Sequence, residues 1–529
     1  MNFFQLYRKD IFFIVGICLL YVLIIVVISP KVATLGTDGV SYALMAQSLT
    51  EGKGLTVFGE PHVFFSPLFS FFIVPFFFFI GDIYLAARVA MITLSLLSLP
   101  LFYYLMRLMA GKTQAVIGTI FLLFNAGWIM MTNNVLAQPL AGFLALALLV
   151  ALIKFLRVKD AKLSKAFIHY FVIGFLLGAA YLTRPEYLFS VIPVVLFMWF
   201  INKRRLSFEE NVRAIIVPII VFSLLVVPYI LFLHKYTGQW TFSGRLNEQF
   251  LVSAQLSRED TSLLHPTSLG TNPLSLFFKN ISSFVKVYFK NIFGIERVLL
   301  RSFGIIGFVF FGFGLASFVF SRKFGLLFSV GVMMFSLLFL ALGHTGERGY
   351  IGPFLFLFII IISVGCHYAI IKLSDFFQFN KKKRALLLSA VVTISALYFF
   401  FSVIQSYLFL PKSFKPAEYQ MTGEWFRFNV DDFDRELIVA RNPEIAFYSK
   451  SRWYEISGAE RLDDLVEKMK KNSANYLVLD QRGLGENFYR LVGNNNPSAL
   501  HPHLDLLKEF RYYDKVVYLY RLNIHENKR

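Results

Sequence analysis

Twelve mostly apolar stretches run through the first three quarters of this chain, and they constrain its fold more than any other feature. A helix needs about 20 such residues to cross the hydrocarbon core of a bilayer. The stretches cover residues 11–29, 64–80, 84–106, 113–131, 139–156, 167–183, 187–201, 212–233, 299–320, 324–342, 350–373 and 385–410. With 57% of its 529 residues apolar, the chain is not an ordinary soluble enzyme. The sequence predicts an α-helical polytopic membrane protein.

The net charge of +19 is distributed unevenly along the chain. Residues 412–529 hold 19 basic and 18 acidic residues, whereas residues 1–411 hold 33 and 15. The basic excess lies in short loops between apolar runs, where the positive-inside rule and anionic lipids account for it, so we predict no nucleic-acid partner. The two cysteines, Cys18 and Cys366, both lie in apolar runs and form no disulfide framework.

The basic loops predict the orientation of the chain. Arg8 and Lys9 precede the first run, and no small-residue cleavage site follows it, so we interpret this run as a retained anchor with a cytoplasmic N-terminus. The basic loops near residues 107–112, 154–165, 203–205, 322–323 and 381–384 are then also expected in the cytoplasm. The C-terminal segment is expected outside. The few cysteines and this external segment fit a bacterial plasma membrane.

One apolar run conflicts with this orientation. If all twelve runs crossed, the loop with Arg107 and Lys112 would lie outside and every later loop would be inverted. The run 64–80 is short and contains Pro67 and Pro75, which leave helix-end backbone groups without partners in lipid. We therefore predict that this run lies along or re-enters the outer leaflet. About eleven crossings remain.

Residues 412–529 are predicted to form a separate external domain after a membrane domain of residues 1–411. Short apolar stretches at 437–440, 476–479 and 516–520 alternate with a helical pattern at 462–469, which is typical of a small α/β fold. The segment has no phosphate-binding loop, nucleophile elbow or metal-type Cys/His spacing. Asp431, Asp432 and Asp434 resemble part of a calcium loop, but the later Gly and Glu are absent and we interpret them as a solvated turn.

Candidate chemistry lies in the loops expected outside. Asp38 is the first acid after the first run and begins an amphipathic helix with Tyr42 on its apolar face. It could be an N-cap, a functional carboxylate, or both. Arg184 and Arg348 are costly at the membrane surface unless each is paired or faces a wet cavity. Pairing with a neighbouring Glu, or snorkelling, is the structural alternative for each arginine.

These loops together resemble the GT-C membrane glycosyltransferases, and most closely glycosyltransferase family 39, which includes protein O-mannosyltransferases and lipid A aminoarabinose transferases. The similarity covers most of residues 1–375 in order and spacing, and the final segment resembles the external domain of many bacterial members. The motifs are Asp38-Gly-x-x-Tyr42, Pro67-Leu-Phe, Gln138-Pro, Leu182-Thr-Arg-Pro-Glu186 and Arg348-x-Tyr350-x-x-Pro353.

The resemblance implies transfer of a sugar from a polyprenyl-phosphate donor to an external glycan, lipid or protein acceptor, usually with inversion. Asp38 would be the general base, because a hydroxyl is a weak nucleophile until a carboxylate takes its proton. Arg184, Arg348 and His62 would bind the donor phosphate. The supporting residues would be Tyr42, Glu60, Gln138, Glu186 and Tyr350. The lipid tail would lie against the Phe-rich run 64–80, and no tightly bound cofactor is expected.

The chain also departs from the family pattern. Many relatives have an acid and a Lys just before the Pro-Leu pair, where this chain has Phe64, Phe65 and Ser66, and an acid often stands at the position of Gln138. These differences leave a bound divalent metal and the phosphate contacts open. A transporter or flippase is the main alternative function, although no inverted repeat is visible. A non-catalytic scaffold would make Asp38 dispensable, and no channel-like filter is found.

Overall fold

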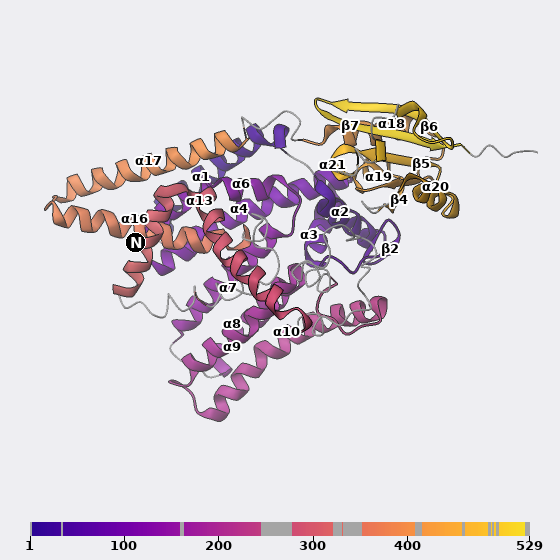
Figure 1. The fold of residues 1–529 in the computed structure, drawn as a ribbon. Coiled ribbons are helices and arrows are strands. Elements are labelled where there is room, and N and C mark those ends of the chain that lie inside the picture. Colours follow the sequence, from indigo (N-terminus) through magenta and orange to yellow (C-terminus); the bar gives the residue numbers. More distant parts are fainter. Residues whose placement is uncertain are drawn as a thin grey trace, which may run out of the picture.

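The computed structural model describes residues 3–32, 35–158, 163–244, 278–320, 331, 352–407, 415–456, 461–484, 488, 491–492 and 497–523. Most of the chain is helical (Figure 1). The helices before the C-terminal domain are α1 (Phe3–Val32), α2 (Gly36–Thr50), α3 (Leu68–Ile80), α4 (Ile83–Met109), α5 (Lys112–Leu123), α6 (Ala126–Asn133), α7 (Gln138–Leu156), α8 (Leu163–Thr183), η1 (Pro185–Tyr187), α9 (Leu188–Asn202), α10 (Phe208–Thr237), α13 (Ile281–Phe320), η2 (Gly352–Phe354), α16 (Leu355–Phe376) and α17 (Lys381–Tyr407).

Nine helices in the described part of the chain are long and apolar enough to cross a membrane. Helices α5 and α6 are separated by a 54° bend. They make a tenth crossing if the pair is counted as one span. The predicted run 324–342 lies outside the described residues. Helix α3 has only 13 residues, too few to span a bilayer. This agrees with the prediction that the run 64–80 does not cross.

An ion cluster fixes the relative direction of the first spans. Asp10, near the start of α1, is 4% exposed and forms salt bridges with Arg107 and Lys112, and the Lys112 Nζ lies 2.6 Å from Asp10 Oδ1. The start of α1, the end of α4 and the start of α5 therefore lie on one side of the bundle. We call this the N-terminal side. Helix α3 can thus join α1 to α4 only without crossing.

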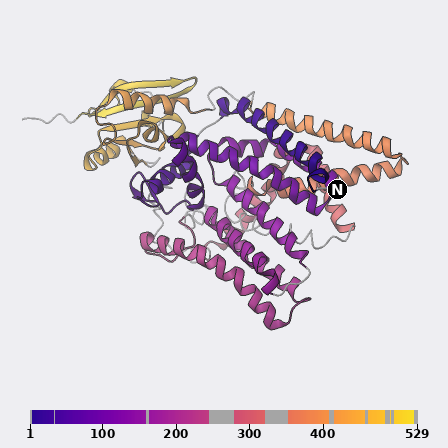
Figure 2. The same cartoon turned by 180° about the vertical axis from the view of Figure 1, so that it is seen from behind.

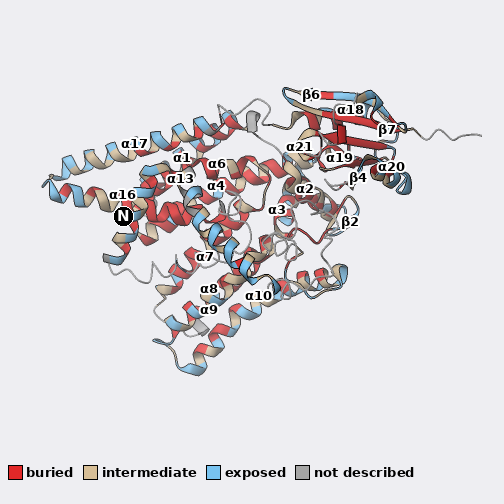
Figure 3. Ribbon diagram, in the orientation of Figure 1, coloured by how far each residue is buried: buried red, intermediate tan, exposed pale blue. Residues whose placement is uncertain are grey.

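The bundle is held by close helix contacts, as expected where lipid supplies no hydrophobic drive between helices. A Cβ on Gly365 of α16 would overlap the Phe310 carbonyl oxygen and the backbone of Gly314 in α13, so this pair packs backbone to backbone. Helices α1 and α17 lie side by side, as the two opposite views agree (Figure 2). Exposed residues concentrate on α10 and α17, whereas α7 and α16 are largely buried (Figure 3).

Basic and capping residues close the spans on the N-terminal side. Arg205 donates to the carbonyl oxygens of Leu156 and Val158 at 3.0 and 2.8 Å, which satisfies orphan carbonyls at the end of α7. Ser207 and Glu210 form a capping box at the start of α10. The basic loop that sets the predicted orientation therefore also completes helix ends.

The C-terminal domain contains one five-stranded sheet with the strand order β4-β3-β5-β7-β6. Strands β3, β4 and β5 are parallel, and β7 pairs antiparallel with both β5 and β6. The predicted strands and helix near 437, 476, 516 and 462 are present. The elements are α18 (Ala417–Asn429), β3 (Leu437–Ala440), α19 (Glu444–Ser449), β4 (Arg452–Glu455), α20 (Leu462–Lys471), β5 (Tyr476–Asp480), α21 (Gln481–Leu484), η4 (Pro497–Ala499), β6 (Leu504–Tyr512) and β7 (Lys515–Leu522).

Helices cover both faces of this sheet. One hydrophobic cluster joins α18 and α19 to the sheet, and another joins α20 to its opposite face. The alternating direction of the crossovers places β4 on one side of β3 and β5 on the other, so β3 and β5 flank a topological switch point. Asp431, Asp432 and Asp434 lie in an exposed turn. The domain sits beside α2, far from the N-terminus (Figure 1).

Candidate active site

A cavity of about 250 Å³ lies at the end of the bundle that carries the C-terminal domain. We call this end the domain side. The cavity is lined mainly by aromatic and other apolar groups, with a few polar groups that converge on it, which is the composition of a small-molecule site. Its lining residues are Asp38, Tyr42, Phe64, Phe65, Ser66, Ala137, Gln138, Thr183, Arg184, Pro185, Glu186, Leu188, Phe189, Phe242 and Ser243.

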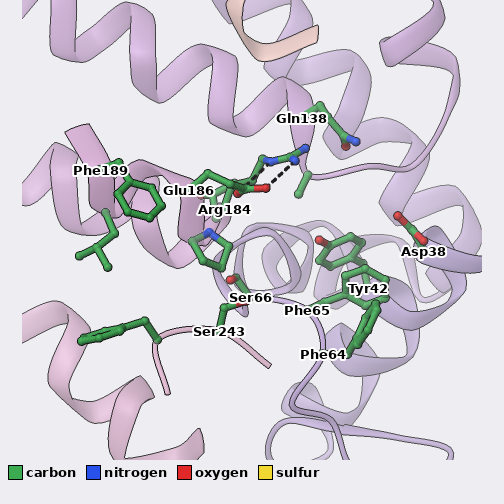
Figure 4. A pocket seen from close by; sticks show the side chains of 15 residues that line it. Asp38, Tyr42, Phe64, Phe65, Ser66, Gln138, Arg184, Glu186, Phe189 and Ser243 are labelled. Carbon is green, nitrogen blue, oxygen red and sulfur yellow. Dashed lines mark hydrogen bonds and ion pairs between the residues drawn. The ribbon is translucent and has the colours of Figure 1, made fainter. Parts of the chain in front are cut away.

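Asp38 lies in the first turn of α2 and lines this cavity (Figure 4). The helix start predicted from the sequence is correct, but the N-cap alternative is wrong. The N-cap residue is Leu35, and no side chain caps the helix. Asp38 forms no hydrogen bond or ion pair with any residue that the structure describes. Its carboxylate is half-buried at the cavity, and no hydrogen bond or salt bridge to a described residue holds it.

Close packing sets the position of α2. A Cβ on Gly39 would lie 2.9 Å from the carbonyl oxygen of Val135, so glycine at this position allows α2 to approach the segment before α7. The Tyr42 ring packs against Phe65 and Phe69, with ring centroids 4.9 and 5.1 Å apart. These contacts fix Tyr42 in the cavity wall one helical turn after Asp38.

Arg184 and Glu186 lie on the other side of the cavity from Asp38 (Figure 4). Arg184 follows α8 in an extended conformation, and Pro185 starts the short helix η1, so the turn predicted from the sequence is present. The Arg184 Nη2 donates to Glu186 Oε1 at 2.9 Å, and the arginine side chain is 9% exposed. The expected ion pair therefore exists, and the same pair lines the cavity.

A short hairpin leads to the aromatic wall of the cavity. Strands β1 (Thr56–Val57) and β2 (Glu60–Pro61) precede Phe64, Phe65 and Ser66, which line the cavity. His62 is buried and stacks on Phe65 with ring centroids 5.3 Å apart, but it is not part of the lining. Glu60 is exposed on β2 and does not line the cavity.

The remaining predicted residues divide into two groups. Gln138 begins α7 and lines the cavity. Arg348 and Tyr350 lie outside the described residues. Ser243 and Phe242, which the sequence analysis did not select, also line the cavity. No motif surrounds these two residues, and only the tertiary fold brings them to it.

The cavity thus contains the Asp38 carboxylate and the Arg184 guanidinium group, together with the aromatic wall. A carboxylate without a fixed partner can accept a proton from a hydroxyl, and a guanidinium can bind an oxyanion through two parallel hydrogen bonds. Within the described ranges, no group of three or more His, Cys, Asp and Glu side chains is placed to hold a metal ion.

Known structures share this fold. The crystal structure of ArnT from Cupriavidus metallidurans bound to undecaprenyl phosphate matches with a TM-score of 0.60 and 13% identity, and covers 97% of this chain and 98% of that one. The oligosaccharyltransferase AglB from Archaeoglobus fulgidus, in complex with an inhibitory peptide and a dolichol-phosphate, also matches with a TM-score of 0.60 and 13% identity, over 90% of this chain and 70% of that one. No family model and no curated protein matches. The predicted GT-C fold is confirmed.

Proposed function

We propose that this chain is a membrane glycosyltransferase that moves a sugar from a polyprenyl phosphate to an acceptor outside the cytoplasm. The observation that carries the proposal is that Asp38 and Arg184 line one aromatic cavity in a GT-C fold. The solved relatives support the donor class, because one is bound to undecaprenyl phosphate and another to a dolichol-phosphate. A nucleotide site is not needed for a donor that is already activated.

Asp38 is the proposed general base. The acceptor hydroxyl gives its proton to the Asp38 carboxylate, and its oxygen forms a bond to the anomeric carbon of the sugar. The bond from this carbon to the phosphate oxygen breaks, and the electron pair leaves with the polyprenyl phosphate. Attack from the side opposite the leaving group inverts the anomeric configuration. Positioned base catalysis of this kind contributes roughly 10²–10⁴-fold.

Arg184 is the proposed phosphate ligand. Negative charge grows on the leaving phosphate in the transition state, and a fixed cation in a partly dry site stabilises it more than water does. Glu186 holds the guanidinium in place at 2.9 Å. Arg348 is proposed as a second cation at the same phosphate, with Tyr350 near it. His62, which the sequence analysis expected at the phosphate, does not line the cavity, and we propose instead that it holds the Phe65 ring in the cavity wall.

The remaining parts of the site have proposed roles on the acceptor and lipid sides. Tyr42 and Gln138 line the cavity and would orient the acceptor sugar or hydroxyl. Glu60 is exposed on the hairpin and would meet the acceptor as it enters. The polyprenyl chain would lie along α3, where Phe78 and Phe79 are 74% and 84% exposed. We place the protein in the plasma membrane with its N-terminus in the cytoplasm.

A donor panel tests this function. The purified protein in lipid nanodiscs is mixed with a set of polyprenyl-phosphate sugars and candidate acceptors, and free polyprenyl phosphate is measured. Transfer releases this lipid, with an equal amount of glycosylated acceptor. A flippase would instead move the intact donor across the membrane of a proteoliposome without releasing lipid phosphate. Translocation of the intact donor without such release would reject the transferase proposal.

A further inference from the structure

The C-terminal domain contacts the membrane domain at the segments that build the cavity. Thr37, the neighbour of Asp38, donates from its Oγ1 to Glu444 Oε1 at 3.0 Å. The ring of Phe58, in the turn between β1 and β2, packs on Trp453 with centroids 5.6 Å apart. The two contacts hold the first turn of α2 and the hairpin that leads to the cavity wall. The domain is therefore linked to α2 and to the hairpin, two of the segments that build the site.

Glu444 reaches α2 because of the sheet topology. It follows β3 and begins α19, so it lies at the carboxyl edge of the parallel strands, close to the switch point between β3 and β5. That edge is where α/β folds place functional side chains. In this chain the edge faces the first turn of α2, as the hydrogen bond from Thr37 shows.

Glu444 is a buried carboxyl group without a cation. It is 5% exposed, and its Oε2 has no hydrogen-bond partner among the residues that the structure describes. Two arginines of the domain are engaged elsewhere, Arg441 with Glu455 at 3.2 Å and Arg482 with Glu418. No Lys or Arg of the described chain forms an ion pair with Glu444. A buried carboxylate in this setting is costly, so the neutral acid is favoured.

The groups around Glu444 act in both directions, since hydrogen bonds from its own backbone N–H and from Thr37 lower its pKa, whereas nearby acids raise it. Asp480 on β5 and Asp38 on α2 face it with negative charge, and Tyr419 and Tyr448 face it from α18 and α19. Burial is the largest effect, and together with the two acids it outweighs the two hydrogen bonds, so that the pKa of Glu444 is raised from 4.5 to about 7. The pKa of Glu444 is higher in the folded protein than in the unfolded chain. The stabilisation of domain docking by protonated Glu444 is therefore complete below about pH 4.5. It is lost as the pH rises through about 7.

We propose that Glu444 is a positioning residue for Asp38, which as a neutral acid holds the first turn of α2 through Thr37 and releases it when ionised. This inference rests on the proposed function, since it assigns Glu444 a role in aligning the base. Ionised Glu444 would be a buried charge beside Asp38, and the first turn of α2 would move to relieve it. The C-terminal domain is thus part of the catalytic unit.

The contact between Phe58 and Trp453 contains no titratable group, so it provides a comparison that is independent of pH. Phe58 has a φ of 51° and Gly59 a φ of 87°, a left-handed pair that favours Asn-Gly in such turns. The ring contact with Trp453 offsets the cost of phenylalanine at this position. Loss of the ring should loosen the hairpin equally at every pH.

The test measures turnover of the full-length protein against pH in Glu444→Gln, Thr37→Val and Phe58→Gly, with the exposed Glu467→Gln as the control. Gln keeps the acceptor for Thr37 and cannot ionise. We expect Glu444→Gln to equal wild type at pH 6 and to exceed it about threefold in kcat at pH 8.5, with KM for the donor unchanged. Thr37→Val should lower kcat at pH 6. Phe58→Gly should reduce kcat by one factor across the range, and Glu467→Gln should follow wild type.

A second readout is independent of transfer. Hydrogen–deuterium exchange of residues 36–42, corrected for the intrinsic effect of pH, should rise in wild type between pH 6 and 8.5 and stay constant in Glu444→Gln. Superimposable exchange and superimposable kcat profiles for these two proteins would overturn the inference while leaving transfer intact. If no donor supports transfer, the proposed function fails, and the exchange result still decides whether Glu444 holds α2.

Discussion

Two carboxylates at opposite ends of the bundle, Asp10 and Asp38, differ in whether direct contacts with basic side chains neutralise them. Asp10 is 4% exposed and contacts both Arg107 and Lys112. Asp38 has no such contact among the described residues, and the cation that lines its cavity, Arg184, is paired with Glu186. A carboxylate neutralised by direct contacts fixes helices. A carboxylate that shares a cavity with a cation but does not contact it remains able to accept a proton.

The comparison is tested most strongly at Asp38. Asp38→Asn should lower transfer by about 10²–10⁴-fold, because the amide cannot accept the proton, while the fold is retained. The measurement is release of polyprenyl phosphate together with the thermal unfolding midpoint. Asp82→Asn is the matched control, since Asp82 caps α4 by accepting from the Leu85 N–H and Asn caps equally well. Wild-type turnover in Asp38→Asn would refute the base assignment.

Arg184 should show the next largest effect. Arg184→Ala removes a charged hydrogen-bond donor that is worth about 1.5–3 kcal/mol, so polyprenyl phosphate should bind about 10–100-fold more weakly. Affinity for this lipid can be measured by titration of the purified protein in nanodiscs. The control is Arg213→Ala, whose guanidinium forms an exposed pair with Glu209. Unchanged affinity in both Arg184→Ala and Arg348→Ala would place the phosphate elsewhere.

The sequence predicted the parts of this site that depend on local pattern. The start of α2, the turn at Arg184 and the spans follow from helical spacing, Pro185 and apolar run length. The bend between α5 and α6 was missed because the apolar run 113–131 is continuous in composition. The bend occurs where the Asn125 side chain accepts from the Trp128 N–H and starts a new helix.

Long-range placement was not predictable in the same way. Ser243 reaches the cavity from a loop without a motif, and Glu444 reaches α2 only through the topology of a separate sheet. The exposed edge strand β6 lacks the apolar run that identified β5. Local sequence pattern predicts the helices and strands and where they end, whereas contacts between distant segments can be seen only in the tertiary fold.

The other half of the comparison is tested at Asp10. Asp10→Asn should destabilise the protein by about 1–2 kcal/mol, less than a fully buried pair would lose, because the side chains of Arg107 and Lys112 are 29% and 52% exposed. Transfer per folded molecule should not change. The measurement is the unfolding midpoint in detergent, with Asp375→Asn as a control for an exposed ion pair. A large loss of turnover without a loss of stability would make Asp10 functional.

Labelling distinguishes the two sides themselves and should leave activity unchanged. Lys53 lies exposed just after the end of α2, the helix that carries Asp38, and Arg204 lies in a basic loop on the side of Asp10. In a chain with Cys18 and Cys366 replaced by Ser, a membrane-impermeant maleimide should label Lys53→Cys in intact cells. Arg204→Cys should react only after permeabilisation, because basic loops stay in the cytoplasm. The reverse pattern would place the Asp38 cavity on the cytoplasmic side, where no external acceptor could reach it.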